Sequence, residues 1–283
     1  MLTKNKTQDS LLWKIERPEG GQSSYLFGTM HVRDLRAFGW LGAAKQHLAE
    51  CEVFATEFDF SDTDPEALAA ALQLPDGKDL EQWLSPQAWK NLDRYARKKF
   101  GSSAENFRHQ HPMTVSTALS MAFLLEESAH SLDETLWQYA RTLGKSTTGV
   151  ETFADQIDIL GKISFDQHLK GLTWILKNYG RHKTRLHKMM RRYADGQIQA
   201  LYQSAKKDAK GMRKVLLYRR NELMAKRFAE IANEQSLFCA VGAGHLAGDK
   251  GMLRLLKKAG FKVRPVLVVS GSLIDHLPLI TYH

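Results

Sequence analysis

Apolar runs that suit buried strands lie near the two ends of the chain. Residues 24–29 and 51–58 form two such runs, and an amphipathic stretch at residues 40–50 separates them. Strand, helix and strand in this order make a βαβ unit, whose crossover favours parallel pairing. Residues 11–15 form an additional short, mostly apolar segment, which we expect as an edge strand of the sheet.

The C-terminal end repeats the same plan. Residues 237–242 predict a strand, residues 244–248 a loop, residues 251–259 a helix and residues 261–269 a further strand. The sequence therefore predicts an α/β fold whose central, mostly parallel sheet is built from both ends of the chain.

Residues 61–236, between these ends, follow mainly a helical period. Apolar positions recur every three or four residues, as on amphipathic helices. The predicted helices cover residues 65–74, 86–100, 113–128, 132–143, 156–160, 165–192 and 194–232. Residues 145–151 interrupt them as a short strand or connector. Because no low-complexity linker divides the chain, we expect one domain over residues 1–283, with residues 61–236 as a mostly helical insertion or cap.

Two segments of the chain share one design. Each is an apolar run that ends in Gly-x-x-His, with Gly28 and His31 in the first and Gly242 and His245 in the second. Glycine lets the backbone turn sharply and approach a ligand closely, and imidazole binds metals or acts as a base. The carboxyl edge of a parallel sheet is where α/β proteins place their chemistry. We therefore expect both histidines in one cleft.

Two carboxylates follow predicted strands in the same way. Glu57 ends the apolar run 51–58, and Glu151 ends the connector 145–151. A carboxylate in apolar surroundings needs a cation, a metal or a proton as its partner. Two histidines and two carboxylates suit a nitrogen–oxygen site for Zn, Mn, Co or Fe, where water is activated and a spare glutamate accepts its proton.

A different interpretation of the second motif is dinucleotide binding. Residues 242–247 satisfy the pattern G-x-G-x-x-G/A through Gly242, Gly244 and Ala247. The next predicted strand ends without the acidic residue that binds ribose, so we favour the histidine site. From their residue types alone, Arg220 and Asn221 would be placed on the surface of a long helix.

The distribution of basic residues indicates a surface that could bind a partner. The chain has a net charge of +9, and much of the excess lies within residues 181–227. A solvated helix face is the simpler interpretation of this basic stripe, and a surface for an acidic partner is the alternative. We expect no specific nucleic-acid binding, because no aromatic residues alternate with the basic ones as in known motifs.

Composition and segment lengths bear on the cellular compartment. The hydrophobic fraction of 43% and charged fraction of 25% are typical of globular proteins, and no apolar run is long enough to span a membrane. The first ten residues lack the apolar region of a signal peptide. Cys51 and Cys239 suit buried free thiols in a reducing compartment. We therefore expect a cytoplasmic protein, unless a secretory leader has been trimmed away.

The motifs together resemble the TraB/PrgY/GumN family, which includes the Tiki metalloproteases. The resemblance extends over nearly the whole chain, in order. It rests on residues 12–14, 25–31, 57, 132–133, 149–156, 220–221, 241–248 and 260–263.

The resemblance implies an erythromycin esterase/ChaN-like α/β fold and, from the Tiki branch, a metal-dependent peptidase that favours manganese or cobalt. His31, His245 and Glu57 fall on matching positions, as do Glu151 and the pair Arg220–Asn221. The resemblance therefore implies that Arg220 and Asn221 lie in the site and not on the surface. An arginine there would bind a substrate carboxylate or stabilise an oxyanion.

The leading hypothesis is a metallohydrolase for a peptide or small acyl substrate. His31, His245 and Glu57 would hold a divalent ion, manganese or cobalt, with zinc as the alternative. Glu151 would be a fourth ligand or the general base, and Arg220 with Asn221 would complete the site. A module that binds haem, a peptide or a small ligand without turnover is the first alternative. A metal-free esterase that uses one histidine as base is the second.

Overall fold

A computed structural model describes residues 9–125, 127–209 and 211–266, and within them one sheet forms the centre of the fold. The strand order is β4-β3-β5-β2-β1-β6, where β4, β3, β5 and β2 run parallel and β1 is antiparallel to both β2 and β6. The strands are β1 (Leu12–Glu16), β2 (Ser24–Thr29), β3 (Val53–Thr56), β4 (Ser146–Gly149), β5 (Leu237–Gly242) and β6 (Lys262–Pro265). The expected α/β fold with a mostly parallel sheet from both chain ends is confirmed.

Strand β5, from the C-terminal part of the chain, lies between two strands from the N-terminal part. It pairs with β2 on one side and with β3 on the other, so the predicted βαβ unit contributes two parallel strands that are not neighbours. Apolar contacts join β5 to both neighbouring strands. The ring of Phe238 lies against the ring of Phe27 on β2 and that of Phe54 on β3. Burial of these three side chains favours the observed register of β2, β5 and β3.

The expectation that residues 11–15 form an edge strand is wrong. Strand β1 lies between β2 and β6, because the last described strand folds back antiparallel and pairs Trp13 with Pro265. This position buries Leu12, Trp13 and Ile15. The final predicted strand, 261–269, is found as β6, and residues 267–269 lie outside the described residues.

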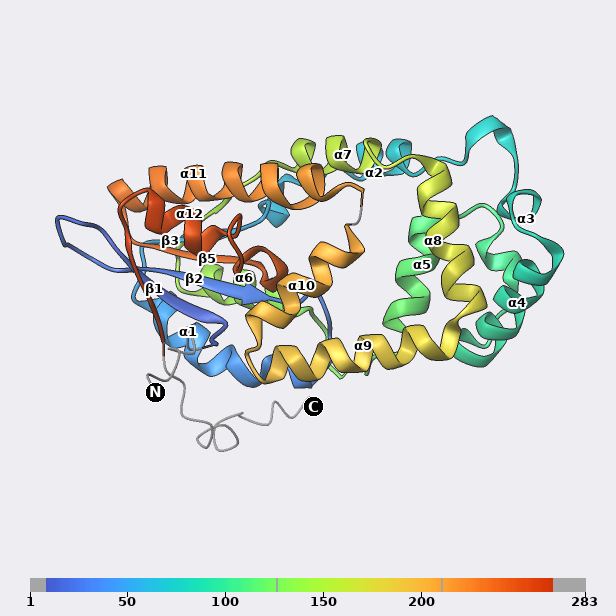
Figure 1. Ribbon diagram of the computed structural model, residues 1–283, viewed down its shortest axis with the longest axis horizontal. Coiled ribbons are helices and arrows are strands. Elements are labelled where there is room, and N and C mark those ends of the chain that lie inside the picture. The colour runs from blue at the N-terminus through green and yellow to red at the C-terminus, as the bar shows by residue number, and fades with distance from the viewer. Residues whose placement is uncertain (1–8, 126, 210, 267–283) are drawn as a thin grey trace, which may run out of the picture.

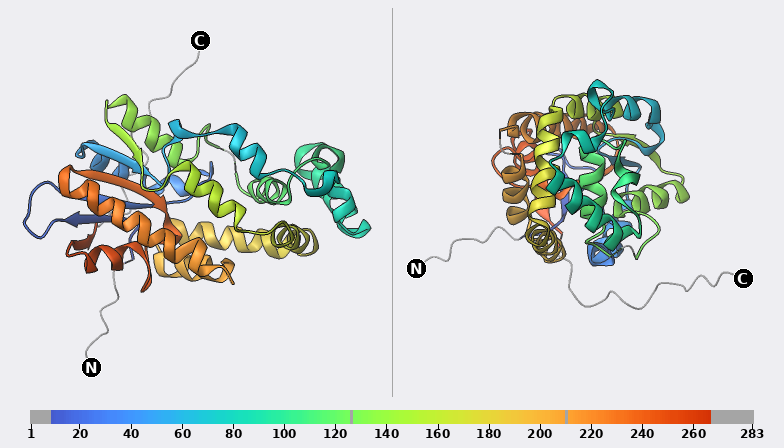
Figure 2. Two further views of the ribbon diagram at one scale, coloured as in Figure 1. Left: turned by 90° about the horizontal axis from the view of Figure 1, so that it is seen from above. Right: turned by 90° about the vertical axis from the view of Figure 1, so that its right-hand side faces the viewer.

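Helices cover both faces of the sheet (Figures 1 and 2). Helices α1 (Leu41–Ala49) and α6 (Leu132–Thr142) pack on one face, and α11 (Arg220–Glu234) and α12 (Met252–Lys258) pack on the other. This arrangement follows from right-handed crossovers that leave the middle of the sheet in opposite directions. None of the helices in the described residues combines the length and apolar character of a membrane span.

A second hydrophobic core lies away from the sheet. It is enclosed by α3 (Leu80–Trp83), α4 (Pro86–Phe100), α5 (Pro112–Met121) and α8 (Phe165–Lys177), which gather at one end of the molecule (Figure 1). Other helices within residues 61–236 contribute instead to the core around the sheet, for example α6 through Leu136. The described part of the predicted insertion is therefore shared between two cores, and the single-domain boundary stays a prediction.

Several predicted helices were too long. The stretch 165–192 is divided at Asn178 into α8 and α9 (Tyr179–Ala194). The stretch 194–232 contains α10 (Ile198–Asp208), a π-helical segment (Lys214–Arg219) and α11. The remaining helices are α2 (Pro65–Ala71) and α7 (Phe153–Gly161). Apolar periodicity continues across these breaks because both sides of each break face a core.

Tyr193 of α9 connects the helices to the strand that carries the first motif. Its side chain is fully buried, and its hydroxyl donates a hydrogen bond to the Gly28 carbonyl at 2.8 Å. We expect Tyr193→Phe to lower the free energy of unfolding by about 1 kcal/mol, because the carbonyl loses a buried partner. Urea unfolding monitored by tryptophan fluorescence measures the change. A midpoint equal to that of the wild type would mean that this hydrogen bond contributes nothing.

Candidate active site

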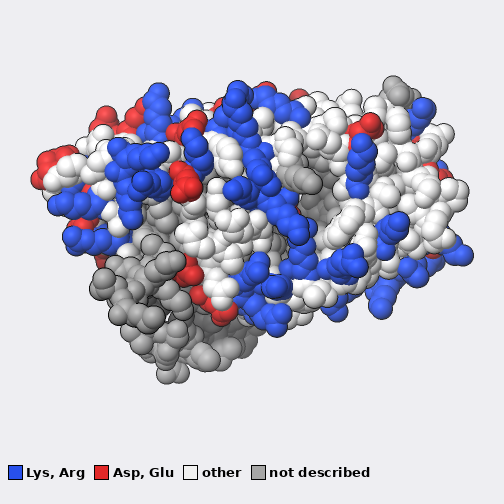
Figure 3. Space-filling view, viewed as in Figure 1, with Lys and Arg blue, Asp and Glu red and all other residues white. Residues whose placement is uncertain are grey.

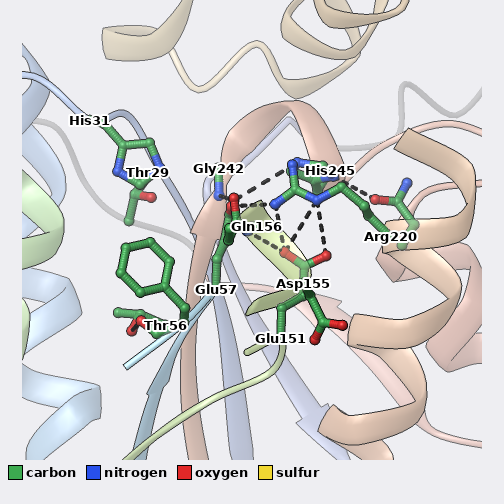
Figure 4. A network of polar contacts seen from close by, with 12 residues as sticks. Thr29, His31, Thr56, Glu57, Glu151, Asp155, Gln156, Arg220, Gly242 and His245 are labelled. Atoms are coloured by element: carbon green, nitrogen blue, oxygen red, sulfur yellow. Dashed lines mark hydrogen bonds and ion pairs between the residues drawn. The ribbon is translucent and has the colours of Figure 1, made fainter. Parts of the chain in front are cut away.

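The side chains singled out from the sequence gather at one edge of the sheet. Strands β2, β5, β3 and β4 run parallel, so their carboxyl ends share this edge. His31 follows β2, His245 follows β5, Glu57 follows β3 and Glu151 follows β4. Four neighbouring strands therefore bring these residues to one edge of the sheet. In Figure 4, His31 lies on one side of Glu57 while His245 and Arg220 lie on the other.

The glycines of the two motifs leave room for side chains that pack closely against their backbone. Gly28 and Gly242 lie outside the left-handed region, so their backbone conformation does not itself require glycine. A Cβ on Gly28 would lie 2.6 Å from the Leu246 side chain, and one on Gly242 would lie 3.1 Å from Oε1 of Glu57. A Cβ on Gly244 would lie 2.9 Å from that of Ala205. Close packing of the loop that carries His245 therefore explains all three glycines.

A buried cation joins the two carboxylates. Nη2 of Arg220 lies 2.6 Å from Oε2 of Glu57 and 2.6 Å from Oε2 of Glu151, while its Nε donates to Oε1 of Glu151 at 2.9 Å. Gln156 donates to Oε2 of Glu151 at 2.6 Å, and the Gly242 N–H donates to Oε1 of Glu57 at 2.8 Å. These are the partners that buried carboxylates require.

Glu57 and Arg220 of this network stabilise each other's charged forms. Burial opposes ionisation of Glu57, but His245, Arg220 and His31, with the Gly242 N–H, outweigh it and hold the pKa of Glu57 well below its usual range. Burial also opposes the charge of Arg220, yet the two glutamates keep its pKa above the ordinary value. For Glu151, burial raises the pKa and Arg220 acts against that rise. Glu57 is therefore a carboxylate at neutral pH.

His245 is held by Asn221 of α11. Its Nδ1 lies 2.6 Å from Oδ1 of Asn221, whose Nδ2 donates to the Lys250 carbonyl at 2.6 Å. Because the amide group of Asn221 uses its NH₂ for that carbonyl, its oxygen accepts from His245, and the proton of the neutral imidazole is on Nδ1. Burial lowers the pKa of His245 to about 4. Its Nε2 is left as a lone-pair donor, 3.8 Å from Oε1 of Glu57.

His31 is held by Asp133, at the start of α6. Its Nδ1 lies 3.0 Å from Oδ2 of Asp133, and Thr29 donates to Oδ1 of the same carboxylate. Asp133 is buried, whereas the His31 side chain is 55% exposed. The Asp133 carboxylate raises the pKa of His31 to about 9. This interaction fixes the ring and leaves Nε2 open.

Asp133 was missed as a site residue. It belongs to a motif that carried the family resemblance, yet nothing in its residue type gave it a role. Its position in the fold indicates the role. Asp133 is the second residue of α6, whose first residue, Leu132, is fully buried. An acidic side chain that is as buried as its apolar neighbour needs a specific partner.

Arg220 and Asn221 face the site, as the resemblance implied, and their placement on the surface from residue types alone is wrong. The Arg220 side chain is 13% exposed, and Asn221 is fully buried. They begin α11 directly after the π-helical segment Lys214–Arg219. A π-helical turn rotates the residues that follow it relative to an α-helical register, and such turns are frequent at functional sites.

The donor atoms suit a metal in their chemistry, although they do not form a closed ligand shell. Within the described residues, no three His, Cys, Asp or Glu side chains are grouped closely enough to hold an ion. Each histidine nevertheless has its Nδ1 turned toward an anchoring oxygen, the arrangement typical of metal-binding histidines. Because Asp133 raises the pKa of His31, this ring would have to lose a proton to bind an ion. Glu57 supplies a carboxylate oxygen between the two histidines. Both oxygens of Glu151 accept hydrogen bonds from Arg220 or Gln156, and its expected role as fourth ligand or base stays a prediction.

Comparisons with known proteins give matches over most of the chain. The sequence model of the TraB/PrgY/gumN family matches residues 11–265. The chain is 26% identical to "Metalloprotease TIKI2" from Danio rerio, over 91% of this chain and 61% of the relative. It is 25% identical to "Metalloprotease TIKI1" from Homo sapiens, over 90% of this chain and 61% of the relative. The chain thus spans about three fifths of the length of these relatives. No solved structure gives a significant match.

The role of Arg220 as counter-ion predicts a large effect on stability. We expect Arg220→Ala to lower the free energy of unfolding by about 3–5 kcal/mol, because two carboxylates would be left buried without their cation. Arg219→Ala is the matched control: the preceding arginine is exposed, and its loss should change stability by less than about 0.5 kcal/mol. Chemical unfolding of both variants measures the difference. Equal effects would show that the network is not a stabilising one.

Proposed function

The chain belongs to the TraB/PrgY/gumN family, and from this we propose that it is a metal-dependent hydrolase that cleaves a peptide or a small acyl compound. Its relatives are named metalloproteases. The observation that carries the proposal is the pair of histidines, from opposite ends of the chain, that flank one ionised glutamate at the sheet edge.

In this proposal His31, His245 and Glu57 hold a divalent ion. The family resemblance favours manganese or cobalt, and the nitrogen–oxygen donor set also suits zinc. When bound, such an ion polarises a carbonyl group and makes water nucleophilic near neutral pH. Asp133 and Asn221 orient the two rings and keep each Nε2 directed away from its anchor.

Arg220 and Glu151 have supporting roles. Arg220 fixes the position of Glu57 and keeps it ionised, and Glu151 holds Arg220 in turn. Of the two glutamates, Glu57 is the one with an oxygen facing His245, so we assign it the contact with the reacting groups. The side chain of Glu151 is fully buried, which leaves it no contact with substrate.

The basic stripe is the second part of the proposal. Lys and Arg side chains gather over α9, α10 and α11 and beside a hollow in the surface (Figure 3). A surface of one charge attracts ligands of the opposite charge and raises their local concentration. We infer that the stripe 181–227 guides an acidic segment of the substrate toward the site.

Metal content and hydrolysis test the proposal together. We expect freshly purified protein to carry a divalent ion in near-stoichiometric amount, and cleavage of a peptide or ester library to be lost with a chelator and restored by Mn²⁺, Co²⁺ or Zn²⁺. His31→Ala and His245→Ala should lose the ion and most of the activity. His109→Ala is the control, because this histidine is 79% exposed and pairs with Asp79.

Two outcomes would contradict the metallohydrolase. Hydrolysis that is insensitive to chelators would favour a metal-free esterase that uses a histidine as base. A Soret band on haem titration, with no cleavage of any substrate, would favour a binding module. Full metal stoichiometry in His31→Ala would remove His31 from the ligand set.

Asp133 gives a separate prediction about metal affinity. We expect Asp133→Asn to weaken Co²⁺ binding by about 10- to 100-fold, because the anchoring partner of a metal-bound histidine tunes both its orientation and its basicity. Titration followed by the visible absorption of Co²⁺ measures the change. Asp93→Asn removes a carboxylate on α4 that pairs with Arg97, and it should leave the affinity unchanged. Similar losses in both variants would indicate general destabilisation.

A further inference from the structure

A pocket of about 390 Å³ opens beside His31. Its apolar lining comes from three places in the chain: Val32 after β2, Phe60 after β3, and a group of residues at and beyond the end of α5. That group is Met121, Leu124 and Leu125. The volume falls within the range of ligand pockets, which are mostly apolar and are usually formed before the ligand arrives. Because His31 itself lines the pocket, any group seated there lies next to the candidate active site.

Hydrogen bonds hold the walls of this pocket together. The Leu125 N–H donates to Oδ2 of the buried Asp34 at 3.1 Å, and the N–H groups of Glu127 and Ser128 donate to the Arg33 carbonyl at 3.2 and 3.0 Å. The segment after α5 is thereby tied to the loop that carries His31. A pocket whose walls are fixed in this way offers binding without a large loss of conformational entropy.

The acidic group at the rim is already engaged. Oε2 of Glu134 accepts a hydrogen bond from the Ser131 N–H at 2.7 Å, as part of the capping box that begins α6. Leu125, in contrast, is 52% exposed although it lines the pocket. A leucine that is half exposed beside a cavity gains free energy when an apolar ligand covers it.

From these observations we propose that the pocket binds one bulky apolar side chain of a peptide substrate, such as leucine, methionine or phenylalanine, adjacent to the bond that is cleaved. This inference rests on the proposed hydrolase function and names its substrate class. A buried side chain of this size accounts for roughly a 10- to 100-fold preference over glycine. Leu125 is a specificity-determining residue in this proposal. His31 lines the pocket and also belongs to the candidate active site.

Peptides that differ at one position test the proposal. A cleaved peptide is varied near its scissile bond to Leu, Phe, Gly or Glu, and kcat/KM is measured for each form with the metal-loaded protein. We expect one position where Leu or Phe exceeds Gly by at least about 10-fold and where Glu is rejected. In Leu125→Glu this preference for Leu or Phe over Gly should disappear.

Two further variants make the test specific to the pocket. Leu35→Glu is the matched control, because Leu35 is 51% exposed, close to the value for Leu125, and does not line the pocket. It should keep the preference of the wild type. Leu125→Met retains an apolar side chain of similar size and should also keep it. Loss of the preference in Leu35→Glu as well would overturn the assignment to this pocket.

A binding measurement separates failure of the pocket from failure of the hydrolase. Fluorescence anisotropy of labelled Leu and Gly peptides with metal-free protein reports binding in the absence of turnover. Tighter binding of the Leu peptide, lost in Leu125→Glu, would support the pocket even if no peptide is cleaved. Cleavage with no apolar preference at any position, together with equal binding of both peptides, would overturn the pocket and leave the hydrolase standing.

Discussion

The candidate site depends on one ion-pair network, in which the guanidinium group of Arg220 joins Glu57 and Glu151. The two glutamates follow neighbouring parallel strands, and their carboxylates would repel each other at this edge without a cation between them. Arg220 comes from a helix on one face of the sheet, so the network also fixes where α11 lies. Asn221, the next residue, is placed by the same constraint, and it orients His245. One buried arginine thus positions a carboxylate and a histidine together.

The two histidines are anchored differently. His31 is paired with a carboxylate and is largely open to solvent, whereas His245 is paired with an amide and is buried. The first anchor stabilises a positively charged ring, and the second suits a neutral one. The site therefore has one ring with a raised pKa beside one with a lowered pKa, on opposite sides of an ionised glutamate. This difference is set by the Asp133 carboxylate beside His31 and by the burial of His245.

The parts of the site that repeat a local pattern could be predicted from the sequence. Apolar runs followed by a glycine and a histidine located β2 and β5, and the parallel pairing of these strands brought His31 and His245 to one edge. Arg220 and Asn221 could not be placed from residue types, because burial of a charge depends on partners that are distant in sequence. Helix ends were predicted poorly where, as at Asn178, both neighbouring helices face a core. The inner position of β1 could not be predicted locally, because it depends on pairing with β6 from the C-terminal part of the chain.

The position of β5 between β2 and β3 has a consequence for biosynthesis. The ribosome releases β2, α1 and β3 well before β5, so the centre of the sheet stays open while the intervening helices emerge. During that interval the apolar faces of β2 and β3 have no native strand between them, which is a condition that favours aggregation of nascent chains. The second core, made of α3, α4, α5 and α8, is complete earlier. The residues of the helical core are therefore all released before the strand that completes the sheet.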